Sequence, residues 1–478
     1  MNPDRLSGLD SSFIHLERGP AHMHIASVSL FEGPAPAYEE FRDHIASRLH
    51  LVPRFRQKLR FVPFNQGRPK WVDDPRFNLS YHVRHTALPA PGSTEQLRTL
   101  AARIFSQRLD RAKPVWEMWL VDGVEGDRFA VVGKSHHCLV DGVSGVDIST
   151  VLFDLDPEPA DPPAPDPWAP RPEPSGAEVL AEALVERASS PAEMIRGARA
   201  LFRAPRQAAR SAVDALEAAG AFARTTMAAP ASSFNVEIGP YRRLAVVESD
   251  LGRFKQIKNE LGGTVNDVVL AVVAGALGRY LRARGHSTQE LELRALVPIS
   301  VRAAGEHGAL GNRVSSFMAP LPVYAEDPVE RLRRVSEAMG DLKQSKQAVG
   351  ATMMTQLSDF APPTIAGQAA RLQPAQRFFN LVVTNVPGPQ FPLYLMGRRL
   401  TSVVPLVPLA RRQAVCFGIM SYDGQINFGL IGDHEAMADL ESLARDLVDS
   451  IEELAAAAGV EAKGQKKSRR VSPRASVS

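Results

Sequence analysis

A run of prolines divides this chain, and it constrains the fold more than any other feature of the sequence. The prolines recur from Pro157 to Pro174. Because proline lacks a backbone N–H and favours extended polyproline geometry, a sheet interior cannot continue through such a segment. We therefore expect the chain to leave a first domain here. Its 478 residues are also too many for one compact core, so the sequence predicts at least two domains.

Helix and strand signals alternate before the proline-rich segment. Val28 and Leu30 alternate with serines, which is typical of a half-buried strand, and 129–132 is a short apolar run typical of a buried strand. Apolar residues from Leu97 to Phe105 recur at helical spacing. The first half therefore predicts a mixed α/β domain.

The second half carries the same mixture. Thr264 can cap an apolar segment that ends near Gly285, and this segment is apolar nearly all round, which predicts a buried helix. Asp423-Gly424 lies between the apolar runs 416–421 and 426–431, which predicts a hairpin. We expect a final amphipathic helix over 436–454.

These signals define four regions. We expect an N-terminal α/β domain over 1–155, a proline-rich and helical crossover over 156–233, a C-terminal α/β domain over 234–460 and a disordered basic tail over 461–478. The predicted fold class is α/β with mixed sheets.

Composition excludes several classes of protein. The formal net charge is only +3, so nothing global argues for nucleic-acid binding. Two cysteines cannot build a disulfide framework or a cysteine-rich zinc site. The sequence begins without an apolar signal region, and its longest apolar run, 268–277, is too short to cross a bilayer. We therefore expect a cytoplasmic protein or one lying on a membrane surface.

Two basic regions are compatible with contact to a lipid surface. One is the tail over 461–478, for which a solubilising end is an equal alternative. The other is a predicted helix on which arginines recur every three or four residues and so share one face. A solvated helix packed against an acidic body would show the same pattern, and Pro205 interrupts it. The arginines of this stripe are Arg196, Arg199, Arg203, Arg206 and Arg210.

One cluster carries recognisable chemistry, the segment from His136 to Gly142. On an extended chain His136 and His137 would point to opposite sides, so only one of them could face a given cleft. Asp141-Gly142 supplies a turn that can bring the carboxylate near an imidazole. A neutral imidazole is the usual group that takes a proton from a hydroxyl near neutral pH.

Other interpretations of this cluster stay open from the residues alone. A metal site would need further ligands at suitable spacing, and none is present, so no metal is expected. The histidines could be structural core residues. Cys138 could be a nucleophile, although its surroundings offer little to activate a thiol.

The segment His136–Gly142 matches the HHxxxDG signature of chloramphenicol acetyltransferase, carnitine acyltransferases and peptide-synthetase condensation domains. Further stretches resemble one branch of this superfamily, the bacterial wax ester synthase/acyl-CoA:diacylglycerol acyltransferase family. They span nearly the whole chain outside the crossover and the tail. These stretches are 6–13, 114–117 with Val115 in place of the family's leucine, Asn266-Asp267, 298–302, Gly311-Asn312, 384–389 and 421–425.

The resemblance implies two chloramphenicol-acetyltransferase-like domains joined by a helical crossover, with the active site at their interface. It implies that His137 is the general base for direct acyl transfer from acyl-CoA, the co-substrate, to an alcohol, with no other cofactor. His136 belongs to the catalytic pair, and Asp141 is expected to be mainly architectural, beside Gly142. Arg302 is a counterion for Asp141 or an ordinary surface arginine.

The second half holds the remaining candidate residues. Asn266 lies in the first turn of the predicted buried helix, where the positive end of the dipole would favour an oxyanion or a thioester carbonyl. It could instead satisfy neighbouring loop backbone. Asp267 can complete a capping box. Thr384 and Asn385 precede a Pro-Gly-Pro turn and could donate to the oxyanion or to CoA, or form the turn. Asn312 is a further support residue by resemblance.

The sequence-based function is an O-acyltransferase that makes triacylglycerol from diacylglycerol and long-chain acyl-CoA. Fatty alcohols are the alternative acceptors, which would make the protein a wax ester synthase. Carrier-dependent peptide condensation and an inactive lipid-binding protein are further alternatives. An insoluble acceptor implies peripheral attachment to the inner face of the plasma membrane or to lipid droplets, and no nucleic-acid partner is expected.

Overall fold

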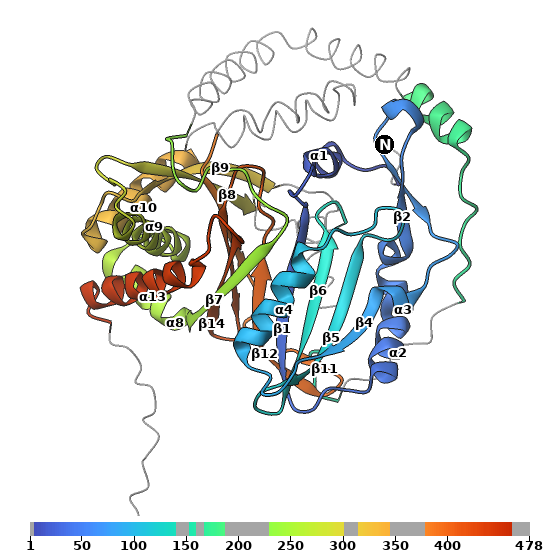
Figure 1. Ribbon diagram of the computed structural model, residues 1–478, viewed down its shortest axis with the longest axis horizontal. Helices are drawn as coiled ribbons and strands as arrows, with labels where there is room; N and C mark the ends of the chain where they lie inside the picture. Colours follow the sequence, from blue (N-terminus) through green and yellow to red (C-terminus); the bar gives the residue numbers. More distant parts are fainter. Residues whose placement is uncertain are drawn as a thin grey trace, which may run out of the picture.

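The computed structural model describes residues 4–139, 153–158, 167–186, 229–300, 314–344 and 378–460. These residues form two lobes, each built on a mixed six-stranded sheet (Figure 1). The predicted α/β class is therefore confirmed. Part of the proline-rich segment is described and has no regular structure over 167–175, whereas 176–186 is helical as predicted.

The first sheet has the order β11-β12-β1-β6-β5-β4. Its central strands β1 and β6 pair antiparallel along their whole length, with His24 opposite His136. The strands are β1 (His24–Glu32), β4 (Val83–Ala87), β5 (Trp116–Val124), β6 (Arg128–His136), β11 (Tyr394–Leu395) and β12 (Arg398–Leu406).

In the described part of the chain, four helices that precede β5, the helical segment 176–186 and a small hairpin complete this lobe. The helices are α1 (Gly8–Leu16), α2 (Tyr38–Arg48), α3 (Leu79–His82) and α4 (Thr94–Ser106), with short 3-10 turns at Leu49–Leu51, Pro53–Arg56 and Pro63–Asn65. The hairpin pairs β2 (Gln57–Arg60) with β3 (Lys70–Asp73). Ser93 caps α4 and forms a capping box with Gln96, which fixes where this predicted helix begins.

The second sheet has the order β7-β14-β13-β10-β8-β9. Its helices lie on the outer side, away from the first lobe (Figure 1). The strands are β7 (Arg242–Asp250), β8 (Glu292–Ser300), β9 (Val314–Pro322), β10 (Leu381–Pro387), β13 (Val415–Tyr422) and β14 (Gln425–Asp433). The helices are α8 (Leu251–Leu261), α9 (Val265–Ala283), α10 (Pro328–Gln344) and α13 (Leu440–Ala457).

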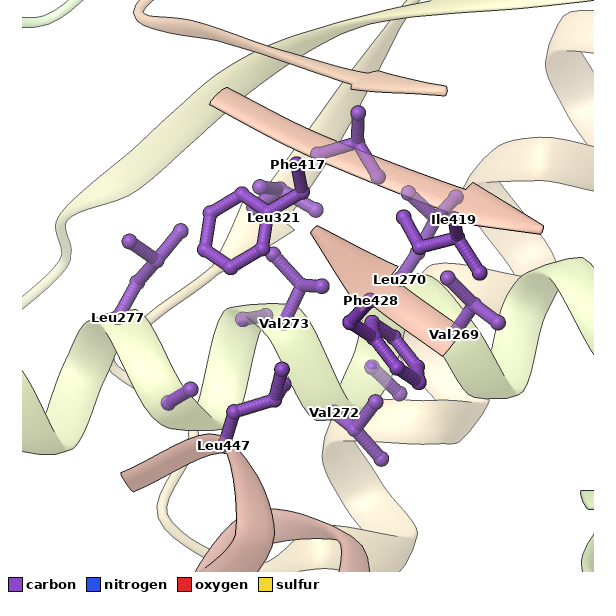
Figure 2. Packing of buried hydrophobic residues seen from close by; sticks show 14 of the residues in the cluster. Val269, Leu270, Val272, Val273, Leu277, Leu321, Phe417, Ile419, Phe428 and Leu447 are labelled. Carbon is purple, nitrogen blue, oxygen red and sulfur yellow. The ribbon is translucent and has the colours of Figure 1, made fainter. Parts of the chain in front are cut away.

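Helix α9 forms the centre of the second lobe. Every residue from Asp267 to Gly278 is buried, as the all-round apolar pattern predicts. Val269, Val273 and Leu277 pack among Phe417 and Phe428 of the sheet, with Leu447 of α13 on the other side (Figure 2). The predicted hairpin is also present, because Asp423 and Gly424 both adopt positive φ, as a tight turn between β13 and β14 requires.

The two lobes share a strand that the sequence-based boundaries do not anticipate. Residues 394–406 belong to the region expected to form the C-terminal domain, yet β12 pairs antiparallel with β1 of the first sheet, Ala26 opposite Leu406. The Pro405 carbonyl of β12 also packs against Gly418 and Gly429 of the second sheet. A hydrophobic core containing Val28 and Ile431 spans both sheets. The lobes are therefore joined by a strand and a buried core.

Candidate active site

The histidine pair lies where β6 ends. His136 is the last residue of the strand, and the chain turns immediately after it, because the Leu139 N–H donates to the His136 carbonyl at 2.9 Å. The His137 N–H donates to the Met23 carbonyl at 2.8 Å, which ties the turn to the approach to β1. The chain is thus not extended through both histidines. Both rings contact the region of α1, His136 through Glu17 and His137 through Phe13.

His136 is fully engaged and only 1% exposed. Its Nε2 lies 2.7 Å from Oε2 of Glu17, the residue after α1. Its Nδ1 accepts the Cys138 N–H at 3.2 Å and lies 3.0 Å from the Cys138 sulfur. Because Nδ1 accepts, Nε2 carries a proton and donates it to Glu17. Neither ring nitrogen is left to receive a proton from a substrate.

Glu17 is a buried carboxylate with basic partners on the loop that follows α4. Its oxygens lie 3.2 Å from Arg108 Nε and 3.2 Å from an Arg111 guanidinium nitrogen. Burial alone would raise the pKa of Glu17, but the hydrogen bond from His136 and the charge of Arg111 outweigh it and lower the pKa to about 2. The carboxylate therefore stays charged at neutral pH and fixes the His136 ring.

His137 has a different environment. Its ring stacks on Phe13 of α1, with centroids 4.0 Å apart and planes inclined by 23°. The residue is half-buried. Its Nδ1 is buried and has no well-aligned hydrogen-bond partner in the described part of the chain. Burial lowers the pKa of His137 to about 4, and contact with its own backbone carbonyl opposes this only in part. The imidazole is therefore neutral at pH 7.

Cys138 does not have the features of a nucleophile. It is 4% exposed, and burial raises the pKa of its thiol well above the usual value. Because the thiolate is the nucleophilic form, a buried and protonated thiol is unreactive. This geometry favours histidine over cysteine chemistry at the cluster. Among the residues with described positions, no group of three or more His, Cys, Asp or Glu residues could hold a metal ion.

A second polar group lies on the other lobe, at the N-terminus of α9. Thr264 and Asp267 form the predicted capping box: the Asp267 N–H donates to the Thr264 hydroxyl at 3.2 Å, and the Thr264 N–H donates to the Asp267 carboxylate at 2.8 Å. Half-buried Asn266 lies in the first turn, and Asn385 Nδ2 of β10 donates a long hydrogen bond to its Oδ1 at 3.5 Å. Thr384 precedes Asn385 on the same strand and is half-buried.

Comparisons with known proteins give the family of this chain. A model described as the wax ester synthase/diacylglycerol acyltransferase catalytic domain matches residues 6–269, and one described as the WS/DGAT C-terminal domain matches residues 310–455. The chain belongs to the wax ester synthase/diacylglycerol acyltransferase family. A probable diacylglycerol O-acyltransferase of Mycobacterium tuberculosis is 33% identical over 467 residues, which cover 95% of this chain and 96% of that protein. A second one is 34% identical over 460 residues, covering 94% of this chain and 98% of that protein.

Solved structures support the same family and fold. The wax ester synthase/diacylglycerol acyltransferase from Marinobacter aquaeolei VT8 is 29% identical, with a TM-score of 0.67, over 95% of this chain and all of that one. A trichothecene 15-O-acetyltransferase from Fusarium sporotrichioides shares the fold at 13% identity, with a TM-score of 0.60 and 94% coverage of both chains. The two-domain chloramphenicol-acetyltransferase-like fold expected from the resemblance is thus confirmed.

The structure brings the predicted residues of this family member into two groups. His136 and His137 meet the region of α1, whereas Asn266, Asp267 and Asn385 gather where α9 begins. Asp141, Gly142, Arg302 and Asn312 lie outside the described residues.

Sequence reasoning missed Glu17 and any role for Phe13. They are four residues apart, so they share one face of the helical end; Phe13 is the last residue of the matched segment 6–13, and Glu17 follows four residues later. That spacing was the available signal.

Proposed function

We propose that this chain is an acyl-CoA-dependent O-acyltransferase that esterifies diacylglycerol with a long-chain acyl group, with His137 as general base. The observation that carries the proposal is the state of the two histidines. His136 has both ring nitrogens engaged, whereas His137 is neutral and half-buried, and in the described part of the chain its ring forms no hydrogen bond with the side chain of another residue. Because Nδ1 of His137 is buried against protein, Nε2 is the nitrogen left to act as base.

The reaction then proceeds by direct transfer. Nε2 of His137 takes the proton of the acceptor hydroxyl as its oxygen attacks the thioester carbonyl carbon. The carbonyl becomes a tetrahedral oxyanion. When this collapses, the carbon–sulfur bond breaks, the ester leaves, and the imidazolium returns its proton to the CoA thiolate. No acyl-enzyme forms, and removal of the base is expected to cost about 10²–10⁴-fold in rate.

The supporting residues divide into two roles in this proposal. We assign His136 a positioning role instead of the catalytic one expected from the sequence, because its ring is held between Glu17 and Cys138. Asn266 is assigned to the oxyanion or the thioester carbonyl, since it lies in the first turn of a 19-residue helix and its amide is oriented by Asn385. Asp267 caps that helix. Asp141, Gly142, Arg302, Asn312 and Thr384 keep the supporting roles expected from the family.

Diacylglycerol is preferred over a fatty alcohol because the two curated relatives of M. tuberculosis carry that name. The family description includes both activities, so wax ester synthesis is the second candidate. A labelled long-chain acyl-CoA should be incubated with the protein and with diacylglycerol, hexadecanol or hexadecane, the last as a matched acceptor without a hydroxyl. CoA release and labelled triacylglycerol are expected with diacylglycerol. Acyl-CoA binding with no CoA release under any condition would make the protein a lipid binder.

The acceptor is insoluble, so peripheral contact with a membrane or lipid droplet is part of the proposal. No single described helix is long and apolar enough to cross a membrane; α8 and α9 reach that threshold only as a pair bent by 97°. The stripe Arg196–Arg210 lies outside the described residues, and its spacing alone motivates this contact. A variant in which the five arginines of the stripe are changed to glutamine should float with anionic liposomes less than the wild type does. Both proteins keep the tail over 461–478, so the tail cannot account for the difference. Equal flotation by both proteins would exclude the stripe as the anchor.

A further inference from the structure

Helix α1 contacts the proposed base, His137, through the side chain of Phe13. The proposed reaction gives this apolar side chain no role. The Phe13 ring lies 4.0 Å from the His137 ring, centroid to centroid, nearly parallel to it at 23°. In the part of the chain that is described, this is the one aromatic contact recorded for His137. A parallel face-to-face contact restricts how the imidazole can tilt and covers one of its faces from water.

Helix α1 is capped at its N-terminus and bound to the first lobe near its C-terminus. Ser7 caps the helix by accepting the Asp10 N–H at 3.1 Å, and its hydroxyl donates to the Asp10 carboxylate at 2.6 Å. Arg111 donates to the Ile14 carbonyl near the other end at 3.3 Å, and Ile14 is buried in the core of the first lobe. A ring carried on such a helix cannot move away without disturbing these contacts.

Burial has the largest influence on the pKa of His137, and the charged groups around the ring have smaller effects. His136 of β6 also lowers the pKa of His137, and His136 is itself paired with Glu17, the charged residue at the end of α1. Asp10 on α1 is engaged by Ser7, and β1 approaches through the main-chain carbonyl of Met23. A stacked phenyl face attracts a protonated imidazole, and this attraction raises the pKa of the ring. The net direction is nevertheless downward, because burial is the largest cause of the lowered pKa of His137.

We propose that Phe13 is a positioning residue for acyl transfer: its ring holds the His137 imidazole in plane and excludes water from one face. This proposal rests on the assignment of His137 as the base. It adds that the C-terminal end of α1 contacts both histidines, because Phe13 stacks on His137 and Glu17 binds His136. A base whose plane is fixed meets the substrate hydroxyl in one orientation, and misplacement of a catalytic group by about 1 Å can cost about 10²-fold in rate.

The test uses the full-length protein and the variant Phe13→Ala, with Phe13→Tyr as the conservative rescue. Leu16→Ala is the matched control, because Leu16 is on the same helix and packs in the lobe-spanning core without a recorded contact to His137. The first readout is the pH dependence of kcat. A general base works when unprotonated, so the wild-type rate should fall as pH drops through the pKa of His137, about 4.

In Phe13→Ala we expect the acid limb to move up by about one pH unit or more, because water reaches the ring and stabilises its charged form. We also expect kcat at neutral pH to fall about tenfold with little change in KM, because orientation is lost while binding surfaces remain. Phe13→Tyr should restore both values, and Leu16→Ala should change neither. A wild-type acid limb and kcat in Phe13→Ala would overturn the proposal.

A second readout does not depend on turnover. Histidine-selective isotope labelling gives the titration of His137 by NMR, with its signal identified by its absence in His137→Gln. The apparent pKa should rise in Phe13→Ala and stay low in Leu16→Ala; equal titration in both would refute the role of Phe13. If Phe13→Ala does not fold, Phe13→Leu replaces it in both measurements. If the wild type releases no CoA, the proposed function fails, while this titration still decides whether Phe13 controls His137.

Discussion

Replacing Glu17 by glutamine should destabilise the protein and slow the reaction through one buried network. The Glu17 side chain is 2% exposed and contacts His136, Arg108 and Arg111. The network lowers its pKa from 4.5 to about 2, which corresponds to about 3 kcal/mol of folding free energy at neutral pH. Glutamine keeps the shape and can still accept from His136, but it leaves two arginines without their charge partner. We expect a loss of about 3 kcal/mol at pH 7.

The sign of the pH dependence follows from the direction of the shift. A carboxylate with a lowered pKa in the folded state contributes its full stability above 4.5 and loses it as pH falls toward about 2. The difference between wild type and Glu17→Gln should therefore be constant from pH 7 to pH 6 and about 1 kcal/mol smaller at pH 4. Urea unfolding followed by tryptophan fluorescence at these values measures it. A difference that does not change with pH would refute the electrostatic reasoning.

The effect on rate needs a matched control, because any unstable variant loses activity. Glu117 on β5 is also buried, at 6% exposure, and pairs with Lys134 and Arg84 at 3.4 and 3.5 Å, but it has no recorded contact with the histidine pair. At a temperature where both variants are folded, Glu17→Gln should lower kcat about tenfold or more, whereas Glu117→Gln should leave kcat close to wild type. CoA release detected with a thiol reagent gives both rates. Equal loss in the two variants would mean that Glu17 acts on stability alone.

Two further perturbations test the other lobe and the junction. A Cβ at Gly429 would lie 2.1 Å from the Pro405 carbonyl oxygen. Gly429→Ala should therefore lower the free energy of unfolding by about 1–3 kcal/mol, because it forces β12 away from the second sheet. An unchanged urea midpoint would contradict this close packing. Asn266→Ala should reduce kcat about 10²-fold. Because Asn385 acts through Asn266, adding Asn385→Ala should reduce kcat little further. Full additivity in this double-mutant cycle would show that the two amides act independently.

The elements that the sequence predicted are those specified by local patterns. The apolar segment after Thr264 became α9, because its periodicity leaves no polar face and its cap is made by neighbouring residues. The Asp423-Gly424 turn followed from the two residue types that tolerate positive φ. Such signals lie within a few residues of each other, so no knowledge of distant contacts was needed.

The features that were not predicted depend on distant residues. The pairing of Ala26 with Leu406 joins strands from opposite ends of the chain, and no local pattern specifies that partner. In the same way, the bond between Glu17 and His136 spans 119 residues. The strand ends at His136, before His137, and a boundary of one residue is beyond what periodicity can place.

The kcat of His137→Gln tests the central claim most directly, with diacylglycerol and long-chain acyl-CoA at saturating concentrations. Glutamine is similar in size and polar but cannot take up a proton at neutral pH, so stacking volume is kept while base chemistry is removed. We predict that folding, measured by urea unfolding, is retained and that ester formation falls by about 10²–10⁴-fold. A folded variant that forms ester at the wild-type rate would contradict the account.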